Sequence, residues 1–201
     1  MAGRRSARGP RIGMPWRWLP NALTVLRLAL VVPIACLLWQ HSDRLALACF
    51  MVAAFSDYAD GALARRWGIE SRFGAVTDPI ADKLTTLAAA GVLTWQGSLP
   101  LAYLGAVALR DLVIVGGATA WRLRFGSVEM APSWISKLNT GLNFLLLLWT
   151  MGVRADLLPG DAGWNALSVA AIVTTLASGV DYVWVWGRKA VRRSRPEPDA
   201  G

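Results

Sequence analysis

The sequence is poor in the residues that build disulfides and soft metal sites. Its 201 residues include two cysteines and one histidine. Cys36 and Cys49 both lie inside apolar segments, and their spacing suits neither a disulfide framework nor a metal centre. His41 stands alone in a short polar segment, where we expect it to be solvated. These shortages exclude a disulfide-stapled scaffold and a cysteine-ligated metal site.

Strand-like alternation and internal repeats are also missing, which argues against a sheet or a solenoid. The apolar stretch after Arg27 lacks a small-residue cleavage site and continues as an anchor, so we expect no cleaved signal peptide. Hydrophobic residues make up 55% of the chain and collect in long blocks. Several blocks approach the roughly 20 residues that a helix needs to cross a bilayer. The blocks cover residues 21–40, 45–65, 75–95, 100–120, 134–152 and 164–186.

We therefore expect an all-α integral membrane protein with six transmembrane helices. The first, fourth, fifth and sixth blocks are the clearest, whereas acids interrupt the second and third. Trp and Arg mix in residues 14–19, which favours a short helix lying in the membrane interface. Residues 1–13 should form a disordered basic N-terminus, residues 14–190 one membrane domain, and residues 191–201 a charged tail.

Positive charge is distributed unevenly along the chain. With six spans and a cytoplasmic N-terminus, sixteen of the 21 Lys and Arg residues fall inside, two outside and three within spans. This asymmetry is typical of membrane proteins whose positive loops stay in the cytoplasm. The net charge of +8 is then explained by basic segments that face an anionic membrane leaflet, which attracts them. We therefore expect no nucleic-acid partner. Most of the 11 tryptophans lie near block ends, as in an aromatic belt.

Four aspartates occupy the second and third blocks. Asp57 and Asp60 are three residues apart, and Asp78 and Asp82 are four apart, so each pair shares one helical face. An acid at the centre of a membrane helix costs roughly 2.5–3.5 kcal/mol on insertion scales. Gathered carboxylates would also repel one another unless a cation lay among them. Carboxylate oxygens suit hard ions, so we expect Mg²⁺ or Mn²⁺ and a phosphate-bearing ligand.

Three other interpretations remain open at this point. The acids could form structural ion pairs with Arg27, Lys83, Arg110 or loop arginines. A membrane scaffold would explain the spans without the acids. A cation transporter would explain acids in a membrane, but it needs a site near mid-bilayer. Here the acids lie near the cytoplasmic ends of their blocks, which favours an enzyme.

The acids belong to a longer pattern that resembles the signature of the CDP-alcohol phosphatidyltransferase family. Every fixed position of that signature is filled by Asp57-x2-Asp60-Gly61-x2-Ala64-Arg65-x8-Gly74-x3-Asp78-x3-Asp82. Upstream, Pro20-Asn21-x-Leu23-Thr24-x2-Arg27 is similar to the start of the family's glycerophospholipid branch. The resemblance covers most of the chain, because the family also has six membrane helices.

The resemblance implies roles for individual residues. Asp57, Asp60 and Asp78 would hold two divalent ions, and Asp82 would be the general base and also contact metal. The CDP-diacylglycerol site would include Asn21, Thr24, Gly61, Ala64, Arg65 and Gly74. The reaction would transfer a phosphatidyl group to an alcohol and release CMP. The resemblance also implies a homodimer, and we expect a bacterial inner membrane, with the mitochondrial inner membrane as the less favoured location.

Arg110 and Lys137 are the candidates for binding the acceptor's phosphate. The alternatives are that Arg110 pairs with the adjacent Asp111 and that Lys137 snorkels to the interface. The segment from Pro132 to Thr140 is more similar to CMP-forming cardiolipin synthases than to phosphatidylglycerophosphate synthases, which usually carry a second lysine there. This favours phosphatidylglycerol over glycerol 3-phosphate as acceptor, because the latter is a small dianion that needs more fixed positive charge.

Overall fold

A computed structural model of the chain describes residues 19–67, 72–126, 133–160 and 162–193. These residues form six α-helices and no strand. The expected basic N-terminus, most of the expected interfacial helix and the end of the charged tail lie outside them. The helices are α1 Leu19–Trp39, α2 Asp43–Trp67, α3 Arg72–Trp95, α4 Leu101–Phe125, α5 Trp134–Arg154 and α6 Ala162–Arg193. They confirm the six helical blocks, and α6 continues beyond the boundary expected at residue 190.

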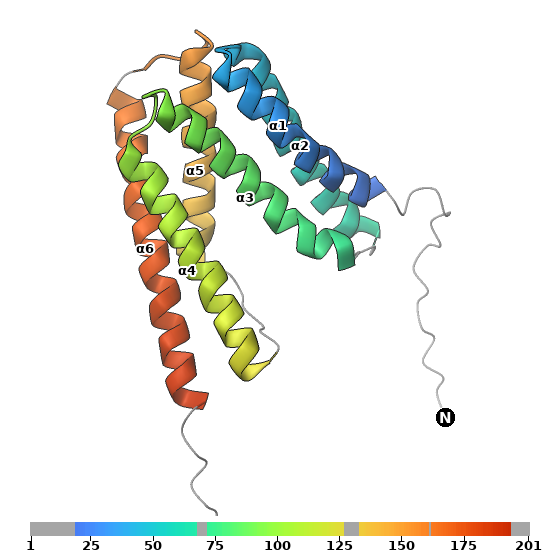
Figure 1. The fold of residues 1–201 in the computed structure, drawn as a ribbon, viewed down its shortest axis with the longest axis vertical. Helices are drawn as coiled ribbons and strands as arrows, with labels where there is room; N and C mark the ends of the chain where they lie inside the picture. Colours follow the sequence, from blue (N-terminus) through green and yellow to red (C-terminus); the bar gives the residue numbers. More distant parts are fainter. Residues whose placement is uncertain (1–18, 68–71, 127–132, 161, 194–201) are drawn as a thin grey trace, which may run out of the picture. The chain divides into compact units, whose positions relative to one another are not determined.

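The chain divides into two compact units, Met1–Ala89 and Ala90–Gly201, and the boundary falls within α3. In the first unit α1 and α2 lie side by side (Figure 1). The turn between them is tight, and Ser42 donates its backbone N–H to the carbonyl of Leu37. Ile34 and Leu38 of α1 and Phe50 of α2 are buried in this unit. Because the connection is so short, the two helices pack as antiparallel neighbours.

In the second unit α6 packs against both α4 and α5 (Figure 1). Gly117 of α4 allows close approach to α6, since a β-carbon there would lie 2.4 Å from Cζ3 of Trp186. At the other end of α6, the indole N–H of Trp164 donates to the hydroxyl of Thr150 on α5 at 2.9 Å. In a membrane, lipid tails cover an apolar helix surface as well as another helix does. Small residues and side-chain hydrogen bonds of this kind therefore hold the helices together.

Three helices in the described part of the chain are long and apolar enough to cross a membrane. They are Asn21–Trp39 in α1, Leu101–Arg124 in α4 and Gly163–Lys189 in α6. The expectation that α5 is among the clearest spans is wrong by this measure. Ser136, Asn139 and Asn143 lower its apolar character, and all three are buried inside the protein.

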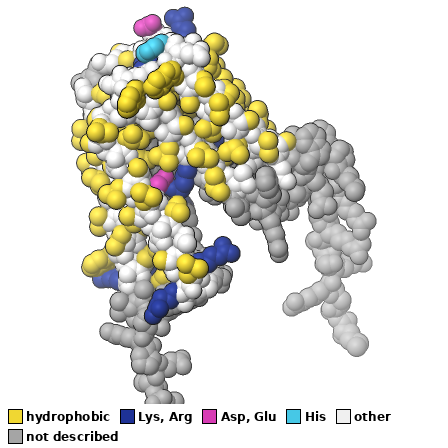
Figure 2. All heavy atoms as spheres, in the orientation of Figure 1, with side chains coloured by type: hydrophobic (Ala, Val, Ile, Leu, Met, Phe, Trp, Pro, Cys, Tyr) yellow, Lys and Arg dark blue, Asp and Glu magenta, His cyan; other side chains and the backbone are white. Residues whose placement is uncertain are grey.

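Exposed side chains of the helices are largely hydrophobic. Val32 on α1, Leu112 on α4 and Val180 on α6 are each more than 60% exposed. Figure 2 shows hydrophobic side chains over much of the visible described surface, with charged side chains few between its ends. Contiguous apolar surface on this scale needs apolar surroundings, which for these long helices are those of a bilayer.

Candidate active site

The signature aspartates lie on two helices of the first unit. Asp57 and Asp60 belong to α2, and Asp78 and Asp82 belong to α3. Asp57 and Asp82 are exposed, whereas the side chains of Asp60 and Asp78 lie outside the description. Among the side chains that are described, no three acidic, histidine or cysteine residues gather around one point. The four-carboxylate cluster therefore stays a prediction, supported by the helical placement of all four residues.

Asp57 forms an ion pair with Arg27 of α1. Nη1 of Arg27 lies 2.8 Å from Oδ1 of Asp57, and the arginine side chain is 2% exposed whereas the aspartate is 55% exposed. A cation inside an apolar helix needs a counter-charge, and Asp57 supplies it. The structural ion-pair interpretation is thus confirmed for this one acid. The sequence marked Arg27 as a possible ion-pair partner of the acids and as the last residue of the upstream pattern, and the continuous apolar run that follows it directly makes its charge unusual.

The ion pair does not prevent Asp57 from holding a metal. A carboxylate has about four lone-pair positions on two oxygens, and Arg27 engages one oxygen. The other oxygen belongs to a side chain that is more than half exposed. Carboxylate donors of this type fit hard divalent ions such as Mg²⁺ or Mn²⁺. The residues present are therefore compatible with the metal that the sequence predicts.

The residues expected to bind the CDP-lipid are distributed over three helices. Thr24 is buried on α1, one turn from Arg27, and Asn21 is half-buried near the start of the same helix. Gly61, Ala64 and Arg65 continue α2 beyond Asp57. Gly74 lies in the first turn of α3. The side chains of the α2 and α3 members lie outside the description, so their contribution stays a prediction.

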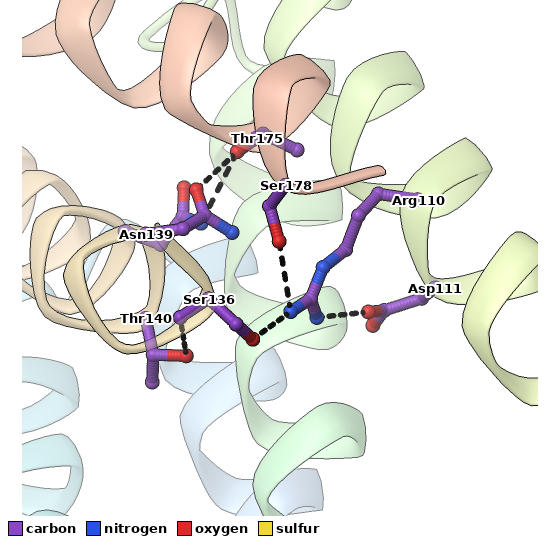
Figure 3. A network of polar contacts seen from close by, with 8 residues as sticks. Arg110, Asp111, Ser136, Asn139, Thr140, Thr175 and Ser178 are labelled. Carbon is purple, nitrogen blue, oxygen red and sulfur yellow. Dashed lines mark hydrogen bonds and ion pairs between the residues drawn. The ribbon is translucent and has the colours of Figure 1, made fainter. Parts of the chain in front are cut away.

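Arg110 lies at the centre of a polar network in the second unit (Figure 3). Its Nη1 donates to Oδ1 of Asp111 at 2.9 Å, so the pairing that the sequence left open as an alternative for Arg110 is present. Its Nη2 donates to the hydroxyl of Ser136 on α5 at 2.9 Å and approaches that of Ser178 on α6 at 3.5 Å. The guanidinium carbon lies 5.8 Å from the ring centroid of Tyr182. Three helices thus fix one cation.

A second polar group lies further along the α5–α6 contact. The side-chain oxygen of Asn139 accepts hydrogen bonds from Asn143 at 2.9 Å and from Thr175 at 2.7 Å (Figure 3). Thr174 adds a third bond at 3.2 Å. Asn139 and Ser136 are one turn apart on α5, as are Thr175 and Ser178 on α6. This group therefore sets how α5 and α6 face each other where the two serines meet Arg110.

Lys137 follows Ser136 in the first turn of α5 and is exposed. The helix begins where the sequence predicts, because the side chain of Ser133 accepts the backbone N–H of Ser136 at 3.2 Å. Sequence reasoning singled out Arg110 and Lys137 but missed Ser136 and Ser178. Serines are common in contacts between membrane helices, so a serine alone does not indicate a functional site. The one signal in the sequence was that each serine lies one helical turn from another polar residue, Asn139 for Ser136 and Thr175 for Ser178.

The chain is similar to known phosphatidyltransferases over most of its length. A family model described as CDP-alcohol phosphatidyltransferase matches residues 17–182. The CDP-diacylglycerol–glycerol-3-phosphate 3-phosphatidyltransferase of Escherichia coli is 34% identical over 165 residues, covering 78% of this chain and 88% of the relative. The corresponding enzyme of Salmonella typhimurium is 32% identical with the same coverage.

A fission yeast protein named cardiolipin synthase (CMP-forming) / mitochondrial hydrolase fusion protein is 32% identical over 182 residues. The alignment covers 82% of this chain but 30% of that longer relative. The family match includes α2 and α3 with their aspartates, and α4 and α5 with Arg110 and Lys137. With its apolar helices and this match, the chain is a membrane protein that belongs to the CDP-alcohol phosphatidyltransferase family, a family of enzymes of phospholipid biosynthesis.

Proposed function

We propose that the protein transfers a phosphatidyl group from CDP-diacylglycerol to phosphatidylglycerol, which gives cardiolipin and CMP. The observation that carries the transferase assignment is the family match across the complete aspartate signature. The acceptor hydroxyl attacks the lipid-bearing phosphorus, a new P–O bond forms, and the bond to CMP breaks. CMP leaves with the electron pair, and Asp82 takes the hydroxyl proton.

Asp57, Asp60 and Asp78 would hold two divalent ions, either Mg²⁺ or Mn²⁺, and Asp82 would also contact them. Enzymes of this family are generally metal-dependent. A divalent metal held there would bind the diphosphate and offset the negative charge that develops on the leaving group. The ion pair with Arg27 would hold the Asp57 carboxylate in position. The nucleotide-lipid would be bordered by Asn21, Thr24, Gly61, Ala64, Arg65 and Gly74.

Arg110 and Lys137 would bind the acceptor's phosphate. Phosphatidylglycerol is favoured because the position of a second lysine is occupied by Asn139, which bonds within the protein instead. The Asp111 carboxylate also offsets part of the charge of Arg110, and a monoanionic diester needs less positive charge than a dianion. Glycerol 3-phosphate is the second candidate, because it is named as the substrate of the bacterial relatives.

We also propose six membrane crossings with the active site facing the cytoplasm of a bacterial inner membrane, and a homodimeric assembly. The distribution of Lys and Arg supports this orientation. Scaffold and cation-transporter alternatives predict no chemistry with CDP-diacylglycerol.

The deciding experiment supplies the purified protein with labelled CDP-diacylglycerol, Mg²⁺ or Mn²⁺, and each acceptor in turn: phosphatidylglycerol, glycerol 3-phosphate or inositol. We expect CMP release with cardiolipin as the product. Asp60→Asn serves as the inactive control, so that contaminating activity is recognised. Phosphatidylglycerophosphate as the product would replace the acceptor assignment, and no CMP release with any acceptor would contradict the transferase proposal.

A further inference from the structure

A groove of about 890 Å³ lies between α4 and α6 in the second unit. Its walls are mostly apolar and include Leu109 and Val113 of α4 with Leu176, Val180 and Val183 of α6. Both helices are candidate membrane spans. Its volume is in the range of about 300–1,000 Å³ that is typical of small-molecule sites. Leu176, Val180 and Val183 are exposed, so the groove opens on the outside of the helices rather than into a closed core.

The charged residues that line the groove are all positive. They are Arg110 in its wall and Arg188 near one end, and no acid is among the described residues that line it. Arg188 stacks over Trp184, with its guanidinium carbon 4.5 Å from the ring centroid. Stacking on the ring holds the plane of the guanidinium group, and the N–H groups at its edge can then donate hydrogen bonds to a phosphate. In the wall, Nε of Arg110 is buried without a hydrogen-bond partner in the described structure.

The length of the groove matches a lipid chain rather than a soluble molecule. Thr175 and Arg188 both line it, and these positions are 13 residues apart, which is about 20 Å of helix at 1.5 Å per residue. Half of a bilayer's hydrocarbon core is about 15 Å thick. The groove is apolar, opens to the bilayer, is about as long as one leaflet is thick and has an arginine at its end. It is therefore complementary to an amphiphile with an anionic head.

We propose that this groove binds an anionic phospholipid of the surrounding membrane, with its phosphate on Arg188 and an acyl chain along Val183, Val180 and Leu176. This site goes beyond the proposed function, because it places the lipid's phosphate on Arg188, whereas the proposed acceptor contact is with Arg110 and Lys137. The stem of Arg110 lines the same groove and packs beside Gly179, where an added β-carbon would lie 3.8 Å from its Cβ and Cγ. A chain in the groove therefore supports the stem of Arg110 from the bilayer side.

The test uses the full-length protein in detergent with photoactivatable phosphatidylglycerol or phosphatidylcholine that carries a diazirine on an acyl chain. CDP-diacylglycerol is omitted and metal is chelated, so the result does not depend on turnover. Labelled positions are mapped by mass spectrometry. We expect phosphatidylglycerol to label residues 175–188 of α6 or 106–113 of α4 at least about fivefold more than phosphatidylcholine. Both lipids carry a phosphate, but the choline cation offsets that charge, whereas phosphatidylglycerol presents a net negative head to Arg188.

Two variants and their matched controls make the test specific. Val180→Trp fills the groove, whereas Val173→Trp adds the same bulk two turns away on an exposed position that does not line it. Arg188→Gln removes the phosphate contact, whereas Lys189→Gln removes the neighbouring charge outside the groove. We expect labelling to fall about fivefold in the first member of each pair and to stay unchanged in the second.

Three results would overturn the proposal. Equal labelling by the two lipids would show bulk lipid contact only. Unchanged labelling in both Val180→Trp and Arg188→Gln would place the lipid elsewhere. Conversion of a dimeric wild type to a monomer by Val180→Trp would assign the groove to a second copy of the chain. Gel filtration of each variant excludes misfolding, and Arg188→Gln at the exposed end of the groove gives the answer if Val180→Trp does not fold.

Discussion

Arg27 on α1 and Asp57 on α2 form an ion pair in which the cation is buried and the acid is exposed. Their atoms lie 2.8 Å apart, with exposures of 2% for the arginine and 55% for the aspartate. The pair joins the first apolar helix to the first aspartate of the signature. Because only one partner is buried, the two residues are not equivalent in what their loss should cost.

We predict that Asp57→Asn destabilises the protein more than Arg27→Leu. The first change removes the carboxylate that pairs with a buried cation, and bonds to charged groups contribute about 1.5–3 kcal/mol. Arg27→Leu leaves Asp57 without this partner, but the aspartate is more than half exposed and can turn toward polar surroundings, so the loss of stability is smaller. Thermal unfolding in detergent, followed by circular dichroism with metal chelated, measures both. A loss for Arg27→Leu that equals or exceeds that of Asp57→Asn would contradict the asymmetry.

Asp82→Asn should abolish turnover while binding of the CDP-lipid stays largely intact. The amide keeps the size of the side chain but cannot accept the acceptor's proton, and a positioned general base contributes about 10²–10⁴-fold. CMP release and equilibrium binding of labelled CDP-diacylglycerol are the two measurements. Asp156→Asn is the control, because this exposed acid lies after α5, away from the signature. Near-normal turnover by Asp82→Asn would remove it from the base role.

The two serines that hold Arg110 should contribute unequally to acceptor binding. Ser136 accepts at 2.9 Å, whereas the contact with Ser178 is at 3.5 Å, the limit for a hydrogen bond. We expect Ser136→Ala to raise the KM for the acceptor about tenfold and Ser178→Ala to raise it less. The KM for CDP-diacylglycerol should stay constant in both. Equal changes in the two KM values would indicate a general loss of folding instead.

Neighbouring glycines on α4 should respond in opposite ways to alanine. At Gly117 a β-carbon would lie 2.4 Å from the Trp186 ring, whereas at Gly116 nothing lies within 4 Å. Gly117→Ala should therefore cost about 1–3 kcal/mol through overpacking. Gly116→Ala should stabilise the helix by about 0.5–1 kcal/mol.

Thermal unfolding of both glycine variants in detergent checks this pair. Adding Trp186→Leu to Gly117→Ala should recover part of the loss, because the shorter side chain leaves space for the methyl group. The same melting temperature for the two single variants would show that the α4–α6 contact does not depend on Gly117.

The elements of this fold follow from the sequence because they depend on local properties. Apolar runs near the length of a membrane span located all six helices, and the block that starts at residue 134 matches the start of α5. The three- and four-residue spacings placed each pair of aspartates on one helix. The adjacency of Arg110 and Asp111 was enough to raise their ion pair as an alternative, which the structure shows. The family resemblance, which rests on fixed residues in one stretch, was likewise visible in the sequence.

Partners from different helices were decided only by tertiary structure. Arg27 had four acids within reach by sequence, and the packing of α1 on α2 selected Asp57. Ser136 and Ser178 became partners of Arg110 because α5 and α6 turn their polar faces toward α4. Periodicity shows that a helix has a polar face, but the rotation of that face depends on side-chain packing between helices. For that reason the sequence determined which residues carry charge here, and the fold determined which of them meet.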